Sequence, residues 1–220
     1  MNNPILFTGA SSRRSRSLSR RHVLAGGVIA GISTAIGTSV FKPRPVHASD
    51  AAANDAEILN TALYYEHQAI WAYSFAAGAL SDTEVGRAVK ALALRNQADH
   101  MAHRDTLASV IESLGETPVE PENEYDLSAY IERGEGNIDS DVNIAKLALA
   151  LETDAAIAYA SEVARLKTPA LVTAGASIGS TEASHATAIR AAFVALGVDI
   201  DYVPAAFVSS DTRDAWILKV

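Results

Sequence analysis

The sequence predicts an all-α protein built as a four-helix bundle, with a long crossover between helices 2 and 3. Four long stretches place apolar residues at helical spacing. A segment rich in proline, glycine and acidic residues separates the second stretch from the third. Two helical hairpins joined by one long connection are an established bundle topology. An up-and-down bundle with an elaborated middle loop is the alternative.

Residues 1–48 differ in composition from the rest of the chain and are interpreted as a targeting segment. They contain seven Lys or Arg residues and no Asp or Glu. The stretch Ser19–Leu24 is typical of a twin-arginine export signal, an apolar stretch follows from Val23 to Phe41, and Val46–Ala48 offers a small-residue cleavage site. We expect cleavage, with an uncleaved membrane anchor as the alternative. Export to the bacterial periplasm or the thylakoid lumen is expected.

Residues 49–220 are predicted to form one acidic domain. All 26 acidic side chains and 11 of the 18 basic ones lie there, which gives a formal charge of −15. Such a domain is a poor candidate for nucleic acid or anionic membranes, and it favours metal cations or a basic partner. Membrane contact is expected only through an uncleaved leader. The chain has no cysteine, which excludes disulfides, thiolate metal ligands and thiol nucleophiles.

The first two expected helices cover residues 55–80 and 82–114. In the first helix, apolar residues such as Leu59, Leu63 and Ile70 recur at helical spacing, and no proline interrupts them. The sequence Ser-Asp-Thr-Glu that follows is typical of a turn and a helix cap. A glycine and then a proline end the second helix.

Residues 116–141 are predicted to form the crossover loop. Two prolines and two glycines interrupt any regular pattern there, and acidic residues are dense. Only residues 127–131 favour a short helix. The acidic part of the loop is interpreted as a solvated surface.

The third expected helix covers residues 140–166, and the fourth covers residues 169–196. A threonine followed by Pro169 is typical of a cap with proline at the first helical position. The C-terminal extension, residues 198–220, is expected to be extended. Its apolar residues, such as Trp216, are expected to pack on the bundle, on a second copy of the chain or on another protein.

The first and third helices share a repeated motif. Glu66–Tyr73 and Glu152–Tyr159 both read E-x-x-A-x-x-A-Y. Each glutamate lies on an apolar stripe of its helix. An isolated carboxylate in a core costs several kcal/mol unless it is paired, protonated or bound to metal. Tyr73 and Tyr159 are interpreted as core residues with a buried hydroxyl partner, and hydrogen bonding to groups that surround the metal ligands is the alternative.

Glutamate and histidine side chains on all four helices form a candidate metal site. Glu182 and His185 are three residues apart, so both point from one side of the fourth helix. One glutamate from each of two helices plus Glu-x-x-His from each of the other two is the di-iron carboxylate pattern. The chain matches five of these six positions, and His100 stands where the pattern has a glutamate. The candidate ligands are Glu66, His100, His103, Glu152, Glu182 and His185.

Three neighbouring side chains are open to other interpretations. His67 is expected to cap or pack rather than to bind metal. Asp99 is interpreted as a solvated or helix-pairing acid, because it lies at the wrong angle for the ligand register. For His103, a surface ion-pair cluster with the following arginine and aspartate is the alternative to metal binding.

The chain resembles exported ferritin-like domain proteins of bacteria, a group within the ferritin-like superfamily. The resemblance spans residues 55–196 and rests on the sequences at 63–69, 103–107, 151–152 and 182–185. It implies a ferritin-like four-helix bundle and, in the active members of the family, non-haem di-iron chemistry. Some members of the family have lost their metal.

The histidine at position 100 changes the charge of the candidate site. Three carboxylates and three neutral imidazoles carry a formal charge of −3, whereas two ferrous ions carry +4. More imidazole favours iron, zinc, copper or manganese. We therefore expect two iron ions, with one metal, another divalent metal or none as alternatives. The function hypotheses are oxidation of ferrous iron or consumption of oxygen or peroxide, and alternatively a metal-free or degenerate ferritin-like module with a structural or protein-binding role.

Overall fold

The computed structural model describes residues 50–220, so the expected targeting segment lies outside the described residues. Within residues 50–220, no helix is both long enough and apolar enough to cross a membrane. The predicted all-α four-helix bundle is confirmed. Its elements are α2 (Asp50–Ala79), α3 (Glu84–Ser113), α4 (Ser128–Glu132), α5 (Asp141–Glu162), the 3-10 helix η1 (Val163–Arg165), α6 (Pro169–Ala195) and α7 (Arg213–Trp216).

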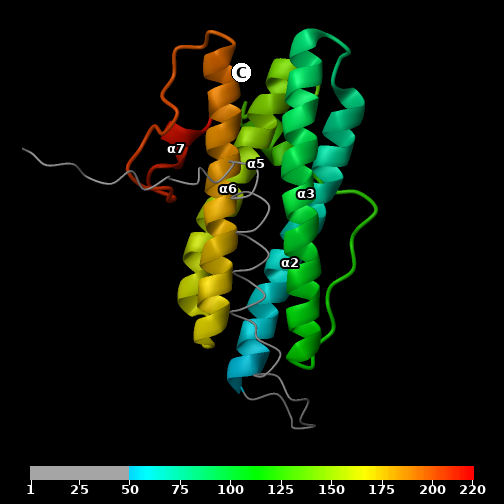
Figure 1. Ribbon diagram of the computed structural model, residues 1–220, viewed down its shortest axis with the longest axis vertical. Coiled ribbons are helices and arrows are strands. Elements are labelled where there is room, and N and C mark those ends of the chain that lie inside the picture. Colours follow the sequence, from blue (N-terminus) through cyan, green and yellow to red (C-terminus); the bar gives the residue numbers. More distant parts are fainter. Residues whose placement is uncertain (1–49) are drawn as a thin grey trace, which may run out of the picture. The chain divides into compact units, whose positions relative to one another are not determined.

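The bundle consists of two antiparallel hairpins, α2 with α3 and α5 with α6 (Figure 1). Helices pack mainly within each hairpin, whereas α2 and α5 approach each other at few points. The first helix begins at Asp50, five residues earlier than the sequence predicts. The other three long helices begin and end within a few residues of their predicted bounds.

The turn between α2 and α3 is fixed by side chains from both hairpins. The Thr83 hydroxyl accepts a hydrogen bond from the Gly86 amide at 3.0 Å, which caps α3. The Asp141 carboxylate, at the start of α5, accepts hydrogen bonds from the Ser81 amide and hydroxyl at 2.8 and 2.6 Å. The start of the second hairpin is therefore tied to the turn of the first.

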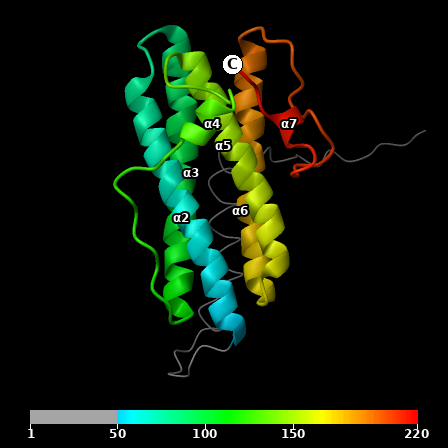
Figure 2. The same cartoon turned by 180° about the vertical axis from the view of Figure 1, so that it is seen from behind.

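The crossover runs along the length of the bundle and carries α4 (Figure 2). Since α3 ends at one end of the bundle and α5 begins at the other, one long connection joins the two hairpins, as predicted. At Gly136 the backbone has a φ of 130°. An added Cβ there would lie 2.3 Å from the backbone nitrogen of Leu147, so only glycine lets the crossover approach α5 this closely.

A carboxylate from α2 holds the segment that precedes α6. Asp55 on α2 is fully buried, and its carboxylate accepts hydrogen bonds from the amides of Lys167 and Thr168 at 2.7 and 3.0 Å. These amides precede α6, whose first residue is Pro169. Asp55 therefore satisfies backbone donors that the helix itself leaves without partners.

The C-terminal extension packs on α5 and α6. Trp216 is 3% exposed and joins Leu149 and Phe193 in the hydrophobic core. The Arg190 guanidinium donates hydrogen bonds to the Asp201 and Trp216 carbonyls at 2.8 and 2.6 Å. The short helix α7 differs from the predicted extended tail, because these contacts fold a segment that has no helical periodicity of its own.

Arg213 links this extension to the crossover and to α5. Its guanidinium contacts the Glu135 carboxylate at 2.8 and 2.7 Å and the Asp154 carboxylate at 2.5 and 2.9 Å. Glu135 is only 1% exposed and has one further partner, Arg133, at 2.9 Å. A buried carboxylate that loses a bidentate partner is left poorly compensated.

We expect Arg213→Ala to lower the free energy of unfolding by about 2–3 kcal/mol, less than the ~3–5 kcal/mol typical of breaking a buried pair, because Arg133 remains. Urea denaturation followed by circular dichroism measures this change. Arg133→Ala is the matched control, and it should cost less than about 1 kcal/mol because its side chain is 46% exposed. Equal effects of the two substitutions would contradict the central role of Arg213.

Candidate metal centre

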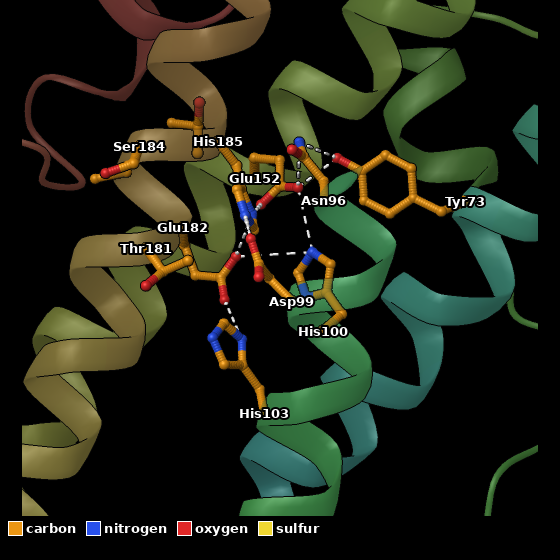
Figure 3. Close-up of polar contacts among 12 residues, drawn as sticks. Tyr73, Asn96, Asp99, His100, His103, Glu152, Thr181, Glu182, Ser184 and His185 are labelled. Atoms are coloured by element: carbon orange, nitrogen blue, oxygen red, sulfur yellow. Dashed lines mark hydrogen bonds and ion pairs between the residues drawn. The ribbon is translucent and has the colours of Figure 1, made fainter. Parts of the chain in front are cut away.

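All six candidate ligands meet inside the bundle. Glu66 comes from α2. Figure 3 shows Glu152 on α5, the histidine pair on α3, and Glu182 with His185 on α6. Each side chain belongs to a residue that is at most 5% exposed. We call the set the Glu–His cluster, and it comprises Glu66, His100, His103, Glu152, Glu182 and His185.

The cluster contains two overlapping groups of four residues, and each group could hold a metal ion. Within each group the ligand atoms lie within 4.8 Å of one another. His100 and Glu182 belong to both groups. The first group is completed by Glu66 and His103, and the second by Glu152 and His185.

The shared histidine faces one carboxylate with each ring nitrogen. His100 Nδ1 lies 2.8 Å from Glu66 Oε2, and its Nε2 lies 3.2 Å from Glu152 Oε1. Glu182 is shared in the same way. Its Oε1 lies 2.9 Å from His103 Nδ1, and its Oε2 lies 3.2 Å from His185 Nδ1. These two residues therefore occupy the middle of the cluster.

One contact in the cluster supports a cation between its atoms. His103 Nδ1 and Glu182 Oε1 are buried and close, yet neither makes a hydrogen bond of good geometry within the described residues. Buried polar atoms in proteins normally have a partner. A cation bound by both atoms would satisfy them. The combination of three carboxylates and three imidazoles suits iron, zinc or manganese, so the residues present fit a metal centre.

The two tyrosines of the repeated motif cross between the hairpins. Tyr73 on α2 donates a short hydrogen bond to Glu152 Oε1 on α5. Tyr159 on α5 donates to Glu66 Oε1 on α2 at 2.5 Å. The sequence favoured core packing with a buried hydroxyl partner for both, and the partner of each phenol is a candidate ligand of the opposite motif. Burial and these carboxylates raise both phenol pKa values, so the hydroxyls remain donors.

Asp99 and Asn96 are polar partners of the cluster that the sequence did not identify as such. Asp99 Oδ2 lies 3.2 Å from His185 Nε2, and Arg95 contacts the other oxygen of this carboxylate at 2.6 Å. The Asn96 amide donates to the Tyr73 hydroxyl at 3.0 Å. Asn96 precedes His100 by four residues on α3, so helical spacing carried a signal for it.

Asp99 fixes the orientation of His185. With Nε2 directed at this carboxylate, Nδ1 faces Glu152 and Glu182. A carboxylate on the far nitrogen is the usual way that a metal-binding imidazole is held in one tautomer. His67 lies apart, with a ring nitrogen 3.2 Å from the Val119 carbonyl on the crossover, in agreement with a packing role.

Burial and ion pairing shift the pKa values of the cluster. Burial alone would raise the pKa of Glu66, but contacts with His100 and His103 outweigh it and lower this pKa to about 2. Burial alone would lower the pKa values of His103 and His185, but their carboxylate partners raise them to about 9 and about 10. Burial raises the pKa of Glu182. Without metal, the cluster is a set of compensating charges.

We expect the metal-free protein to be most stable at mildly acidic pH. The raised pKa values of His103 and His185 contribute stability that is fully present below 6.5 and is lost as the pH rises through about 9 and 10. The lowered pKa of Glu66 contributes stability that is present above 4.5 and is lost as the pH falls through about 2. The urea midpoint of EDTA-treated protein should therefore be highest between pH 4.5 and 6.5.

Bound metal should reverse the alkaline part of this trend. Metal binds neutral imidazole and displaces its proton, so binding strengthens as the pH rises. The comparison is the urea midpoint at about pH 6 and about pH 9, with EDTA and with added metal. A metal-free protein that is more stable at the higher pH would contradict the ion-paired cluster.

The fold and the cluster together define a class of protein, the four-helix bundles with Glu and His ligands on facing helices. Residues 54–195 match the family described as ferritin-like domain, and the chain belongs to this family. It is similar in structure to a conserved hypothetical protein, rv2844, from Mycobacterium tuberculosis, with 24% identity and a TM-score of 0.52. The match covers 72% of this chain and 99% of that chain, and at this identity it shows the fold alone. No curated protein matches the chain.

Proposed function

We propose that this chain is an exported di-metal protein whose Glu–His cluster binds two iron ions for redox chemistry on ferrous iron, oxygen or peroxide. The observation that carries the proposal is the pair of overlapping ligand groups, which share His100 and Glu182. Glu66 and His103 would complete one metal site. Glu152 and His185 would complete the other. Bound iron would supply one-electron redox changes and Lewis acidity.

The residues around the cluster would hold its ligands in place. Tyr73 and Tyr159 donate hydrogen bonds to Glu152 and Glu66, which fixes one oxygen of each carboxylate. Asp99 orients the imidazole of His185 on α6. The low exposure of these residues strengthens each of these contacts.

The export half of the proposal rests on residues 1–48, which lie outside the described residues. A pair of arginines, an apolar stretch and a small-residue end support a twin-arginine signal. The proposed location is the bacterial periplasm or the thylakoid lumen. Fusion of residues 1–48 to a reporter that requires twin-arginine export, with Arg20→Lys and Arg21→Lys as the control, tests it.

Elemental analysis of the full chain, expressed with iron and purified without chelator, tests the metal half. We expect about two iron ions per chain, following the di-iron pattern. The same sample should consume oxygen when ferrous iron is added. A chain that purifies folded and without metal after iron-replete expression would refute the proposal.

A second candidate function is a metal-free module with a structural or protein-binding role. One observation favours it, because three imidazoles with raised pKa values and three carboxylates already balance one another in charge. The exposed apolar side chains of the C-terminal extension, Phe207 at 74% and Val203 at 59%, offer a surface for a partner. Absence of metal from the purified protein would favour this alternative.

A further inference from the structure

A cavity of about 570 Å³ lies between α2 and α5 and reaches the Glu–His cluster. Glu66, His100 and Glu152 contribute to its wall, as do Tyr73 and Tyr159. Residues of the crossover, among them Tyr125, Leu127 and Ile131, cover part of it. Helices pack much more closely within each hairpin than between the hairpins, and the cavity lies between two helices of different hairpins. Its volume lies in the range of sites that bind small organic molecules.

The repeated E-x-x-A-x-x-A-Y motif builds this cavity from both sides. Its two alanines line the cavity on each helix, Ala69 and Ala72 on α2, Ala155 and Ala158 on α5. All four are half-buried. Two helical turns, about 10.5 Å, separate the glutamate of each motif from its tyrosine. Each tyrosine donates a hydrogen bond to the glutamate of the opposite motif, so these four side chains form a polar part of the lining, which we call the polar floor. The small alanines leave the space between the helices unfilled.

Much of the remaining wall is aromatic and apolar. Trp71 and Phe75 stack on each other at 5.8 Å, and Trp71 also lies 5.8 Å from the ring of Tyr125. All three rings line the cavity, together with side chains such as Ile131 and Leu151. Aromatic walls contribute large contact areas to a bound ligand. An apolar ligand body would fit this part of the wall.

The charges of the cavity select against an anionic ligand. Its ionisable lining consists of carboxylates, a histidine and tyrosines, and no lysine or arginine contributes to it. Asp154 is already paired with Arg213, and Glu162 with Arg165. A carboxylate or phosphate of a ligand would meet Glu66 and Glu152 without a free cationic side chain, which makes its burial costly. A neutral group that donates a hydrogen bond fits this floor.

We propose that the cavity binds a neutral, mainly apolar organic molecule with one hydroxyl head, of the alkylphenol class, placed with its head toward Glu66 and Glu152. The cavity, its apolar wall and its polar floor carry the binding site. Only the use of this ligand as a substrate rests on the proposed function, because that step requires metal in the cluster.

Binding of 4-octylphenol to the full chain, measured by isothermal titration calorimetry, tests the proposal. We expect saturable binding with one molecule per chain. The anion 4-octylbenzoate, of similar length, should bind about tenfold more weakly or worse, a difference of ~1.4 kcal/mol. Trp71 also gives an optical signal, because Trp216 is the chain's other tryptophan. In a Trp216→Phe background, quenching of Trp71 should follow the calorimetric isotherm.

Two matched substitutions on α5 locate the site. Ala158→Leu places a larger side chain in the cavity and should weaken 4-octylphenol binding about tenfold or more, or ~1.4 kcal/mol. Ala160→Leu is the control, because Ala160 is exposed and does not line the cavity. Circular dichroism establishes that both variants fold. Equal affinity of the two variants would overturn the proposed location.

Metal analysis of the same sample separates this inference from the proposed function. Iron in the cluster without saturable 4-octylphenol binding overturns the cavity site and leaves the metal centre standing. Binding of 4-octylphenol to a chain that takes up no iron supports the cavity site and refutes the metal centre. Equal binding of the phenol and the benzoate overturns the assigned ligand class.

Discussion

Replacing Glu182 with alanine should remove both metal ions, whereas replacing Glu66 should remove only one. Glu182 belongs to both candidate ligand groups, and Glu66 belongs to one. The Glu182 carboxylate is fully buried between His103 Nδ1 at 2.9 Å and His185 Nδ1 at 3.2 Å. Loss of an outer partner typically lowers metal affinity ~10–100-fold, so loss of a shared ligand should lower it by on the order of 100-fold or more.

The measurement is the metal content per chain after dialysis against metal-free buffer. We expect about two ions in the unmodified chain, about one in Glu66→Ala and about none in Glu182→Ala. His67→Ala is the control, because His67 contacts the crossover and belongs to neither group. It should keep the full content. The same metal content in Glu66→Ala and Glu182→Ala would show that the two groups do not act as separate sites.

The main helices could be predicted because their signals are local. Caps such as Thr83 and Ser140, and the proline that begins α6, are read directly from neighbouring residues. Apolar spacing indicates which face of each helix is buried, and it placed Glu66, Glu152 and Glu182 on apolar stripes. The three histidines were proposed from the di-iron spacing pattern. The start of α2 was missed because the alanines after Asp50 offer no cap to mark it.

Contacts between distant segments could not be predicted in this way. Arg213 and Glu135 lie 78 residues apart in segments without periodicity, so no pattern in the sequence pairs them. The same is true of Arg190, whose partners are carbonyls of the extension. The short helix α7 depends on these tertiary contacts, and local propensity alone favours an extended tail.

The roles of Tyr73 and Asp99 could be predicted only in part from local signals, because they also depend on how the helices pack. Tyr73 is two helical turns from Glu66, too far to reach it, and only the antiparallel arrangement of α2 and α5 brings it to Glu152. Asp99 belongs to neither candidate ligand group. Its contact with His185 depends on how closely α3 and α6 pack, which helical spacing does not determine.

Replacing His100 with glutamate should make the stability of the bundle depend on metal. His100 is 2% exposed, and its two nitrogens contact Glu66 and Glu152 at 2.8 and 3.2 Å. The substitution removes a buried cation and adds a fourth carboxylate to the cluster. Breaking a buried ion pair costs ~3–5 kcal/mol, so we expect the EDTA-treated variant to lose at least about 3 kcal/mol of unfolding free energy.

Iron should restore most of this loss. Four carboxylates match the charge of two ferrous ions, whereas the natural set of three carboxylates falls short by one. His100→Gln is the matched control, because it removes the imidazole without adding a carboxylate. Urea midpoints measured anaerobically, with EDTA and with ferrous iron, should show a larger iron-dependent increase in His100→Glu than in His100→Gln. If iron stabilises neither variant, position 100 is not a ligand position. His100 then serves to balance the charges of Glu66 and Glu152 in a metal-free core.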